Sequence, residues 1–382
     1  MKPIRSISIH PQQQHSLSAK RLLEKTDLSL TQGELPRIDT YREGKRHLHL
    51  DVKKGQSFHR CSAFGKDYVC CNVHVLDQIS NCPYDCSYCF LQSYLTNQTT
   101  QVVTDVEAQL NEIKQKTAQQ PWRFFRVGTW DLGDSLALDP LTGTTSELIE
   151  AFSTLPNAVL ELRTKSDCVD QLLNLDHHQR TIVSWSLNPA DIIEQEEHRT
   201  ASLTQRLEAM KKVMDAGYLL ALHFDPMLVY PGWEKGYDNL IDDIFRFIDP
   251  QRISWISIGS LRFNPEMKKT MSRNFPKSQL TAAEMITGPD GKMRYVKPLR
   301  TRMYRHLMER MVPLLGDNPP FVYLCMERAD MWDKVLGYHP ESANHLDYLM
   351  TESLDQRFPN LVHQTPTRSD YCAKDTAREP NG

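Results

Sequence analysis

The sequence lacks any long apolar run. No stretch of its 382 residues approaches the roughly 18 to 20 apolar residues that a membrane-spanning helix needs. The opening segment, MKPIRSISIHPQQQHSLSAK, also lacks the apolar block of a secretory signal. We therefore expect a soluble, cytoplasmic protein without a membrane partner.

Two phosphate-binding signatures are absent as well. The sequence contains neither a Walker-type glycine loop nor a complete GxGxxG fingerprint. It has no short internal repeat of the solenoid kind. The formal net charge of -3 neither favours nor excludes nucleic acid, because it averages over local patches.

Short apolar runs alternate with amphipathic segments through the middle of the chain. The expected strands are Val73–Ile79, Phe124–Val127, Ala158–Leu162, Thr181–Ser186, Leu219–Phe224 and Ile253–Ile258. The expected helices are Asp105–Thr117, Ser146–Ser153, Val169–Leu173, Leu203–Ala216 and Tyr237–Ile248. Strand–helix repetition predicts an α/β fold with a parallel sheet and functional residues at the carboxyl ends of the strands. About six such units indicate a partial barrel.

The two ends of the chain differ from this middle region. Residues 1–50 are rich in Gln, Ser, His and Arg without a sustained period, which indicates a loosely ordered arm. We assign residues 51–262 to the barrel and 263–363 to a basic C-terminal extension that could bind substrate. Residues 364–382 are polar and broken by Pro and Gly, so we expect a disordered tail.

The C-terminal extension contains a basic stretch. From position 262 to position 310 there are 12 Lys or Arg against 4 Asp or Glu, with Tyr295 and Tyr304 among them. Such a surface could neutralise the phosphates of nucleic acid. The alternative is an ordinary solvated helix face at Leu299–Met311.

Three of the nine cysteines lie together in NCPYDCSYCF, at Cys82, Cys86 and Cys89. In a reducing compartment, clustered thiols are more often metal ligands than disulfide partners. Thiolates are the ligands that iron–sulfur clusters need, and three of them can hold three irons of a 4Fe-4S cubane. The fourth iron would then chelate S-adenosylmethionine, whose reductive cleavage releases a hydrogen-abstracting 5'-deoxyadenosyl radical.

Zinc binding and simple burial are the two alternatives to an iron–sulfur cluster at this triplet. Zinc would need a fourth ligand, which Cys70, Cys71 or His74 could supply, although zinc sites usually pair cysteines as CxxC. The second alternative is a purely structural trio of buried thiols. We expect the other cysteines to be core or surface thiols; they are Cys61, Cys70, Cys71, Cys168, Cys325 and Cys372.

The CxxxCxxC triplet is the signature of radical S-adenosylmethionine (radical SAM) enzymes, and the chain resembles one family among them, the spore photoproduct lyases and their relatives. The resemblance runs from about Cys70 to Tyr338. It is carried by CCNVHVLDQISNCPYDCSYCFLQSYL, GDSLALDPLT, LRTKSDCVDQLL, VSWSLNP, EQEEHRTAS, HFDPMLVYPGWEKGY, WISIGSLRF, GKMRYVKPLR and FVYLCMERADMW. It implies a partial (β/α)6 barrel that binds a 4Fe-4S cluster and S-adenosylmethionine.

The resemblance also implies roles for individual residues. Asp134, Lys165 and Ser186 would lie near the cofactor, whereas Tyr88, Arg294 and Tyr295 would contact substrate. Most of these residues also fit simpler structural roles. Asp134 could cap the next segment, Lys165 could be solvated and Ser186 could bond only to the backbone. Arg294 and Tyr295 could belong to a plain hairpin.

The sequence departs from the family at the step that returns a hydrogen atom to the product. The family uses a cysteine shortly after the second strand, and here Asp131 occupies that place. The relay tyrosine that would follow the third cluster cysteine is Phe90. We assign Tyr88 and Asp131 to the catalytic site, although a carboxylic O–H bond is too strong to donate hydrogen readily. His223 and Asp225 could form an acid–base pair, but more simply they line the barrel mouth.

Three functions are compatible with these features. The leading hypothesis is a radical SAM enzyme acting on modified or damaged pyrimidines in DNA, with a reductase or flavodoxin-type protein as electron donor. The second keeps the cluster but assigns a small molecule or peptide as substrate, because the hydrogen donor is missing. The third is a zinc-stapled binding module.

Overall fold

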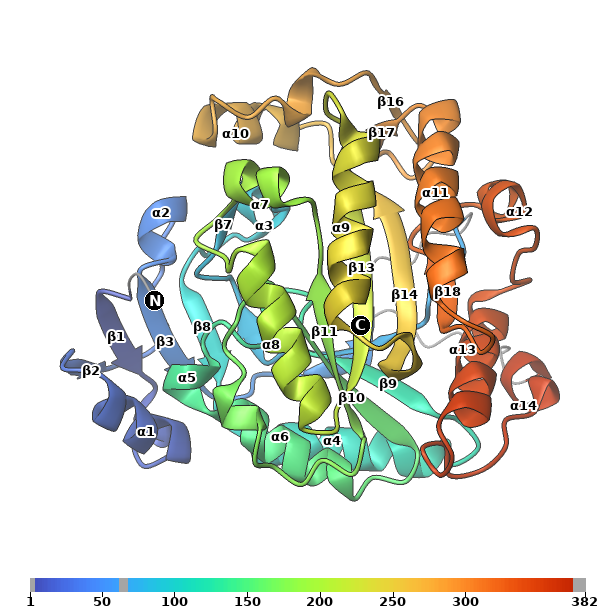
Figure 1. Ribbon diagram of the computed structural model, residues 1–382. Helices are drawn as coiled ribbons and strands as arrows, with labels where there is room; N and C mark the ends of the chain where they lie inside the picture. The colour runs from blue at the N-terminus through green and yellow to red at the C-terminus, as the bar shows by residue number, and fades with distance from the viewer. Residues whose placement is uncertain (1–3, 62–67, 374–382) are drawn as a thin grey trace.

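A curled eight-stranded sheet forms the centre of the molecule (Figure 1). The computed structural model describes residues 4–61 and 68–373. The strand order is β18-β14-β13-β11-β10-β9-β5-β4, parallel throughout except for the edge strand β4. The strands are β4 (Phe58–Arg60), β5 (His74–Leu76), β9 (Phe125–Gly128), β10 (Ala158–Thr164), β11 (Thr181–Ser186), β13 (Leu219–Met227), β14 (Ile253–Ser260) and β18 (Phe321–Leu324). The predicted partial α/β barrel is therefore confirmed.

The strand predictions differ from the structure at three points. The expected strand Val73–Ile79 is two strands, β5 in the barrel and β6 (Ile79–Ser80) in a second sheet, because the chain turns out of the barrel at Asp77–Gln78. The edge strands β4 and β18 were not predicted. Both are short, and β4 carries a His and an Arg, so neither has the long apolar run of a central strand.

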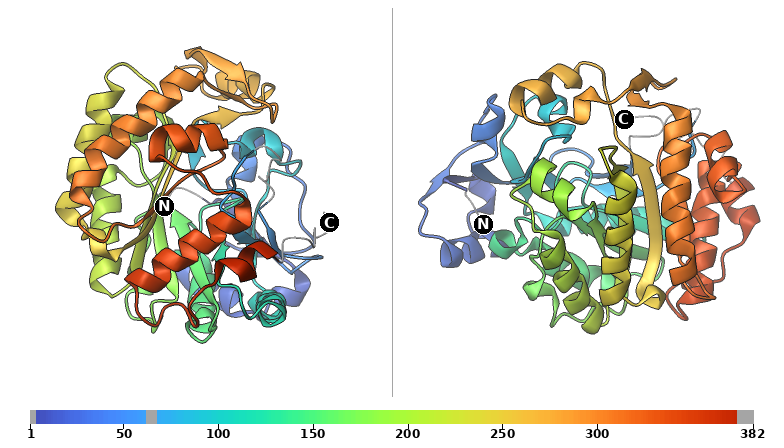
Figure 2. Two further views of the ribbon diagram at one scale, coloured as in Figure 1. Left: turned by 90° about the vertical axis from the view of Figure 1, so that its right-hand side faces the viewer. Right: turned by 45° about the horizontal axis from the view of Figure 1, so that its top comes forward.

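Helices pack around the outside of the barrel sheet (Figures 1 and 2). They are α4 (Val106–Gln119), α5 (Asp139–Thr142), α6 (Thr144–Ser153), α8 (Leu203–Asp215), α9 (Trp233–Phe247), α11 (Lys297–Met311) and α13 (Ala343–Arg357). Helix α8 begins with a capping box between Ser202 and Gln205. The predicted helix Val169–Leu173 is only a 3-10 turn, Asp170–Leu172, because one turn forms too few hydrogen bonds to sustain an α-helix.

A second, five-stranded sheet lies beside the barrel and corrects the prediction of a loosely ordered arm. Its order is β2-β1-β3-β8-β6. Its further elements are β1 (Ser6–Ile9), β2 (Leu30–Gln32), β3 (His47–Asp51), β8 (Thr100–Val103), α1 (Leu17–Lys25) and α2 (Tyr41–Gly44). Ile7, Leu50 and Val102 form its core with Leu22 of α1 and Leu138 from the barrel. Each strand is too short to show a period alone, so only pairing with β8, about fifty residues beyond β3, reveals the sheet.

Smaller elements complete the structure. They are β7 (Asp85–Cys86), β12 (Glu197–His198), β15 (Arg262–Phe263), β16 (Met285–Thr287), β17 (Met293–Tyr295), α3 (Leu91–Tyr94), α7 (Ala190–Glu196), α10 (Met267–Asn274), α12 (Ala329–Leu336) and α14 (Arg368–Ala373). The remaining 3-10 turns are Pro11–Gln13, Pro250–Arg252, Leu280–Ala282 and Val312–Leu314.

The predicted disordered tail is wrong for its first part. Helix α14 is anchored by Tyr371, which is 1% exposed and whose hydroxyl accepts a hydrogen bond of 3.0 Å from the backbone N–H of Phe124. One aromatic anchor in a polar segment leaves no periodic signal. Residues 374–382 lie outside the described residues. Among the described helices, none is both long and apolar enough to cross a bilayer.

Candidate active site

Eight of the ten predicted site residues line one cavity of about 620 Å³ at the carboxyl ends of the barrel strands. They are Cys82, Cys86, Cys89, Tyr88, Asp131, Asp134, Lys165 and Ser186. Cys82 and Cys86 are 8% and 7% exposed. All three cysteines sit on the loop that leaves β6, and this loop is tied to the barrel where β7 pairs antiparallel with β12.

The N-terminal sheet holds this cysteine loop from the other side. The buried Nζ of Lys45 donates hydrogen bonds to the carbonyl oxygens of Cys82 (2.7 Å) and Tyr84 (2.5 Å). Asn81 adopts a left-handed conformation (φ 67°), and its Oδ1 accepts the N–H of Cys82 at 2.8 Å. The preceding Gly44 is required by close packing, because a Cβ there would lie 1.9 Å from the carbonyl oxygen of Gln98.

The three cysteine side chains share one cavity, where a metal cluster could bind. Within residues 4–61 and 68–373, no three His, Cys, Asp or Glu side chains converge where one metal ion could sit. Burial, with Asp134 adding to it, raises the pKa of Cys82 to about 12, and burial raises that of Cys86 well above its ordinary value. Binding of iron would supply the positive charge that converts such thiols into thiolates. A cubane of four irons also takes its thiolates at separate corners.

Asp134 joins the ends of β9 and β10. Its carboxylate accepts hydrogen bonds from the N–H groups of Leu136 (3.0 Å), Ala137 (2.9 Å) and Lys165 (2.7 Å) and from the Thr164 hydroxyl (2.6 Å). Burial raises its pKa. With four donors already bound, the carboxylate can accept little more from a ligand. The capping role considered in the sequence is present, and cofactor contact stays a prediction.

A buried glutamate that the sequence pattern did not single out connects the cysteine loop to the cavity. The Glu197 carboxylate accepts hydrogen bonds from the Tyr88 hydroxyl, from Asn188 Nδ2 (3.0 Å) and from Arg206 Nη2 (2.6 Å). Lys165 Nζ lies 3.5 Å from it. Burial alone would raise the pKa of Glu197, but the cations Lys165 and Arg206 outweigh burial and lower it to about 2. The only feature of the local sequence that points to Glu197 is its place in EQEEHRTAS, one of the segments that carry the family resemblance.

Ser186 ends β11 next to an arginine that the sequence pattern also did not reveal. The Ser186 hydroxyl accepts a hydrogen bond of 2.9 Å from Arg163 Nε. Arg163 also donates to the carbonyl oxygen of Asp225 at 2.8 Å and lies over the ring of Trp130, 5.1 Å from its centroid. The wall of the cavity thus carries a guanidinium fixed by three partners.

His223 and Asp225 both line the cavity but are not partners of each other. Asp225 accepts from Arg262 Nη1 (2.8 Å) and Nη2 (3.2 Å), and His223 Nε2 lies 2.7 Å from Glu161 Oε1. Burial, with Arg163 adding to it, lowers the pKa of His223 to about 4. The histidine is therefore neutral near pH 7.

Asp131 sits near the point where the chain leaves the barrel for the second sheet. Burial raises the pKa of its carboxyl, and the nearby Asp77 raises it further, while His59 opposes both. His59 Nε2 and Asp77 Oδ2 are 2.8 Å apart. Hydrogen bonding to Asp77 raises the pKa of His59 to about 9, so this imidazole is protonated near pH 7.

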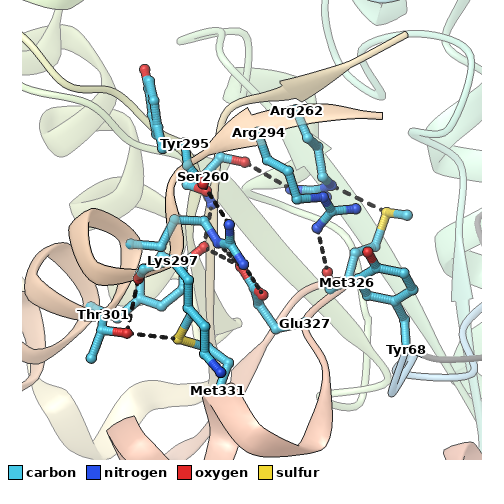
Figure 3. A network of polar contacts seen from close by, with 12 residues as sticks. Tyr68, Ser260, Arg262, Arg294, Tyr295, Lys297, Thr301, Met326, Glu327 and Met331 are labelled. Carbon is cyan, nitrogen blue, oxygen red and sulfur yellow. Dashed lines mark hydrogen bonds and ion pairs between the residues drawn. The ribbon is translucent and has the colours of Figure 1, made fainter. Parts of the chain in front are cut away.

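Arg294 and Tyr295 are not among the residues that line the cavity; both lie in a network of polar contacts (Figure 3). Arg294 is 3% exposed, pairs with Asp290 and donates to the carbonyl oxygen of Met326 at 3.1 Å. Tyr295 is fully buried, and its hydroxyl accepts the N–H of Val229 at 3.2 Å. Lys292, two residues before Arg294, does line the cavity. Substrate contact by the pair stays a prediction.

A partial barrel with a CxxxCxxC loop at the carboxyl ends of its strands is the arrangement of a radical SAM enzyme. The family model described as "Spore photoproduct lyase" matches residues 24–314. The chain therefore belongs to the spore photoproduct lyase family and is a lyase-type enzyme of the radical SAM class.

Individual relatives agree with this assignment. The spore photoproduct lyase of Bacillus subtilis is 26% identical over 250 residues, covering 65% of this chain and 71% of the relative. The Clostridium acetobutylicum enzyme is 23% identical over 273 residues, covering 68% and 78%. A solved spore photoproduct lyase mutant with bound AdoMet and dinucleoside spore photoproduct has the same fold, with a TM-score of 0.74 at 21% identity over 85% of this chain and 98% of that one.

Proposed function

We propose that this chain repairs spore-photoproduct-type pyrimidine lesions in DNA, with a 4Fe-4S cluster on Cys82, Cys86 and Cys89 and S-adenosylmethionine bound beside it. The observation that carries the proposal is the single cavity that the three thiols share with Tyr88 and Lys165 at the barrel mouth. Solved relatives bind AdoMet and a dinucleoside spore photoproduct. We place the reaction in the cytoplasm.

The cluster, when bound, supplies the electron that cleaves S-adenosylmethionine into methionine and a hydrogen-abstracting adenosyl radical. The chain's own residues do the positioning. Lys45 and Asn81 fix the backbone around Cys82, so the thiols face the cavity. The Glu197 carboxylate holds Lys165, which follows β10, and the Tyr88 side chain of the cysteine loop. A cationic Lys165 at this place would attract the carboxylate of the methionine moiety.

The cavity wall from β10 to β13 would receive the nucleoside parts. Ser186 and Arg163 present a hydroxyl and a guanidinium there, and both suit ribose and carbonyl oxygens. Neutral His223 and the Asp225–Arg262 pair border the same space. Because these side chains are fixed by protein partners, they would orient a substrate without rearranging first.

Return of a hydrogen atom to the product remains the unusual step. Asp131 lines the cavity in the place of the family's donor cysteine, but its carboxylic O–H bond is too strong to give a hydrogen atom to a carbon radical, so another donor must close the cycle. The Tyr88 hydroxyl already donates to Glu197, which ties the predicted catalytic phenol to the buried ion network. We propose a one-electron carrier of the flavodoxin type as the reductant. The alternative of a small-molecule or peptide substrate is not favoured, because the matching family model and the relatives described above are all spore photoproduct lyases.

Anaerobic reconstitution tests this proposal. The protein is loaded with iron and sulfide, reduced in the presence of S-adenosylmethionine and given dinucleoside spore photoproduct. We expect brown protein with absorbance near 400 nm, 5'-deoxyadenosine and repaired dinucleoside. Cys86→Ala should abolish all three, whereas Cys372→Ala, outside the cavity, should leave them unchanged. Colourless protein with stoichiometric zinc, or a cluster without lesion repair, would contradict it.

A further inference from the structure

An exposed aromatic pair stands at the rim of the cavity. Phe90 is 43% exposed and Tyr94 57%, and both are among the cavity's lining residues, with Ser93 between them. Their ring centroids are 5.4 Å apart, with an interplanar angle of 63°. Two exposed aromatic rings in contact form a local apolar patch, and such patches rimmed by polar residues can mark a binding site. Phe90 directly follows the ligand candidate Cys89, so this pair marks the entrance on the cluster side.

Helix α10 packs against α3, the short helix that carries Tyr94 (Figure 1, and Figure 2, right). Asn274 at the end of α10 donates from Nδ2 to Gln92 Oε1 at 2.9 Å, which joins the two helices. Lys268, Lys269 and Arg273 are exposed on α10. At about 100° per residue, their side chains lie within roughly 140° of the helix circumference. They therefore form one basic side of α10.

Among the residues that the structure describes, this basic side has no carboxylate partner, unlike six other members of the basic stretch. Six other members of the stretch are ion-paired with carboxylates: Arg262, Arg294, Lys297, Arg300, Arg302 and Arg310. Within the described part of the chain, no carboxylate lies within 4.0 Å of a side-chain nitrogen of Lys268, Lys269, Arg273 or the exposed Lys277. Glu266 is the one acid between positions 264 and 278, and it faces the cavity.

We propose that α3 and α10 form a track for the DNA strand next to the lesion, in which a flanking base stacks on Phe90 and Tyr94 and the basic side of α10 contacts the phosphates. The inference rests on the proposed function and extends it from the lesion to its neighbours. Aromatic faces beside a basic groove are how proteins bind single strands without reading sequence, because every base has a π-face. The uncompensated cations complement a phosphate backbone, and the aromatics stand where a strand would leave the cavity.

The test measures equilibrium binding of a fluorescein-labelled ten-nucleotide oligothymidylate to the reconstituted full-length protein by anisotropy. The double variant Phe90→Leu/Tyr94→Leu, which keeps apolar bulk but removes the π-faces, should bind about tenfold more weakly. Phe90→Trp should bind at least as well as the wild type. Binding of dinucleoside spore photoproduct, which has no flanking base, should weaken by a smaller factor than oligothymidylate binding in the double variant.

Charge reversal tests the phosphate contacts separately. Lys268→Glu/Lys269→Glu should weaken oligothymidylate binding and reduce the slope of log K against log salt by about 0.7 for each lost contact, or about 1.4 in total. Helix α1 provides the matched control, since it carries exposed Lys20 and Lys25 beside exposed Leu17 on another side of the molecule (Figure 1). Lys20→Glu/Lys25→Glu should leave the salt slope unchanged.

Two outcomes would overturn the inference. The first is that Phe90→Leu/Tyr94→Leu and Lys268→Glu/Lys269→Glu both match the wild type in oligothymidylate affinity and in salt slope. Circular dichroism would verify that both variants are folded. The second outcome would show that α3 and α10 form a surface for a protein electron donor instead. In that case the variants would slow 5'-deoxyadenosine formation with flavodoxin but not with dithionite, and DNA binding would stay intact. If the wild type fails to repair the dinucleoside yet the variants lose oligonucleotide affinity, the proposed substrate is wrong and the nucleic-acid track stands.

Discussion

The barrel sheet and the N-terminal sheet both hold the cysteine loop, but they do so through different chemistry. From the barrel side, the Glu197 carboxylate binds the Tyr88 hydroxyl within a network of buried charges that reaches Lys165 in the cavity. From the N-terminal side, Lys45 and Asn81 bind backbone atoms of the loop. The barrel contact therefore couples the loop to the cavity's electrostatics, whereas the N-terminal contact sets only the path of the backbone.

This difference separates two kinds of expected defect. Damage on the barrel side should change both stability and chemistry, because the same charges face the ligand space. Damage on the N-terminal side should loosen the loop and leave the cavity side chains in place. Variants on the two sides should therefore differ in which measurement they change.

Glu197→Gln should be the most disruptive. It leaves Arg206 buried without its ion partner and replaces the charged acceptor of the Tyr88 hydroxyl with a neutral amide. Breaking one side of a buried ion pair costs about 3–5 kcal/mol. We expect a loss of that order in the free energy of unfolding at pH 7, measured by urea denaturation, together with reduced 5'-deoxyadenosine formation. A loss below 1 kcal/mol would show that the network contributes little.

The pH dependence of the same residue provides a second readout. The folded pKa of Glu197 is about 2, below its ordinary value of 4.5. Stability from its ionised form is therefore fully present above about pH 4.5 and lost as the pH falls toward 2. The wild type should lose its advantage over Glu197→Gln across that window. A constant difference between the two proteins from pH 7 to pH 3 would contradict the assignment.

A pair of matched leucine-to-alanine changes, one in the core of each sheet, tests whether the two sheets unfold separately. Leu220 of β13 and Leu50 of β3 are both fully buried, in the barrel core and the N-terminal core respectively. Either leucine-to-alanine change should cost about 2–5 kcal/mol. Hydrogen exchange should show lost protection throughout the barrel for Leu220→Ala, but mainly in residues 6–51 and 100–103 for Leu50→Ala. Equal loss everywhere in both variants would make the two sheets one cooperative unit.

The same contrast explains how much of the fold the sequence could predict. Strands such as Thr181–Ser186 and Ile253–Ser260 are buried on both faces, so they appear as continuous runs separated by clear helical segments. The N-terminal strands are three to five residues long, and β3 carries two histidines. Their partners β8 and β6 lie beyond the start of the barrel. A pattern within one window cannot record such pairing.

The site divides in a similar way. The cysteine triplet lies within eight residues of sequence, so its spacing alone predicts a shared function. The family resemblance implied the positions of Lys165 and Ser186 near the cofactor, and their places at or just after predicted strand ends agree with it. No pattern in the neighbouring sequence indicates the roles of Lys45, Arg163 and Glu197. Their roles come from contacts with residues that are 23 to 109 positions away in the chain. The C-terminal hairpin contains Arg294 and Tyr295, but their side chains turn into the protein.

Lys45→Met tests the N-terminal contact directly. The change keeps an unbranched apolar stem but leaves two buried carbonyl oxygens without their charged donor, at a cost of about 2–3 kcal/mol. We expect a lower iron content after reconstitution and faster loss of the 400 nm absorbance to a chelator. The affinity for dinucleoside should stay within about twofold of the wild type. Lys20→Met on α1 is the control, and matching behaviour of the two variants would rule out the contact.

Asp131→Asn should change the free energy of unfolding least of these variants. The sign of that change is informative, because we expect it to be stabilising. Asp131 lines the cavity, yet it interacts with Asp77 and His59 where the chain passes from the barrel to the second sheet. Because its folded pKa is raised, the ionised carboxylate costs stability near neutral pH, and this cost disappears as the pH falls below the ordinary value of 3.8. Asparagine carries no charge, so the variant should be more stable than the wild type at pH 8, by less than about 1 kcal/mol, and equal to it near pH 3. If the carboxyl group also takes part in product formation, turnover should fall while stability rises, a combination expected of a residue retained for chemistry rather than for folding. Unfolding curves at both pH values, run beside a lesion-repair assay, distinguish this from a structural role, in which stability and turnover would fall together.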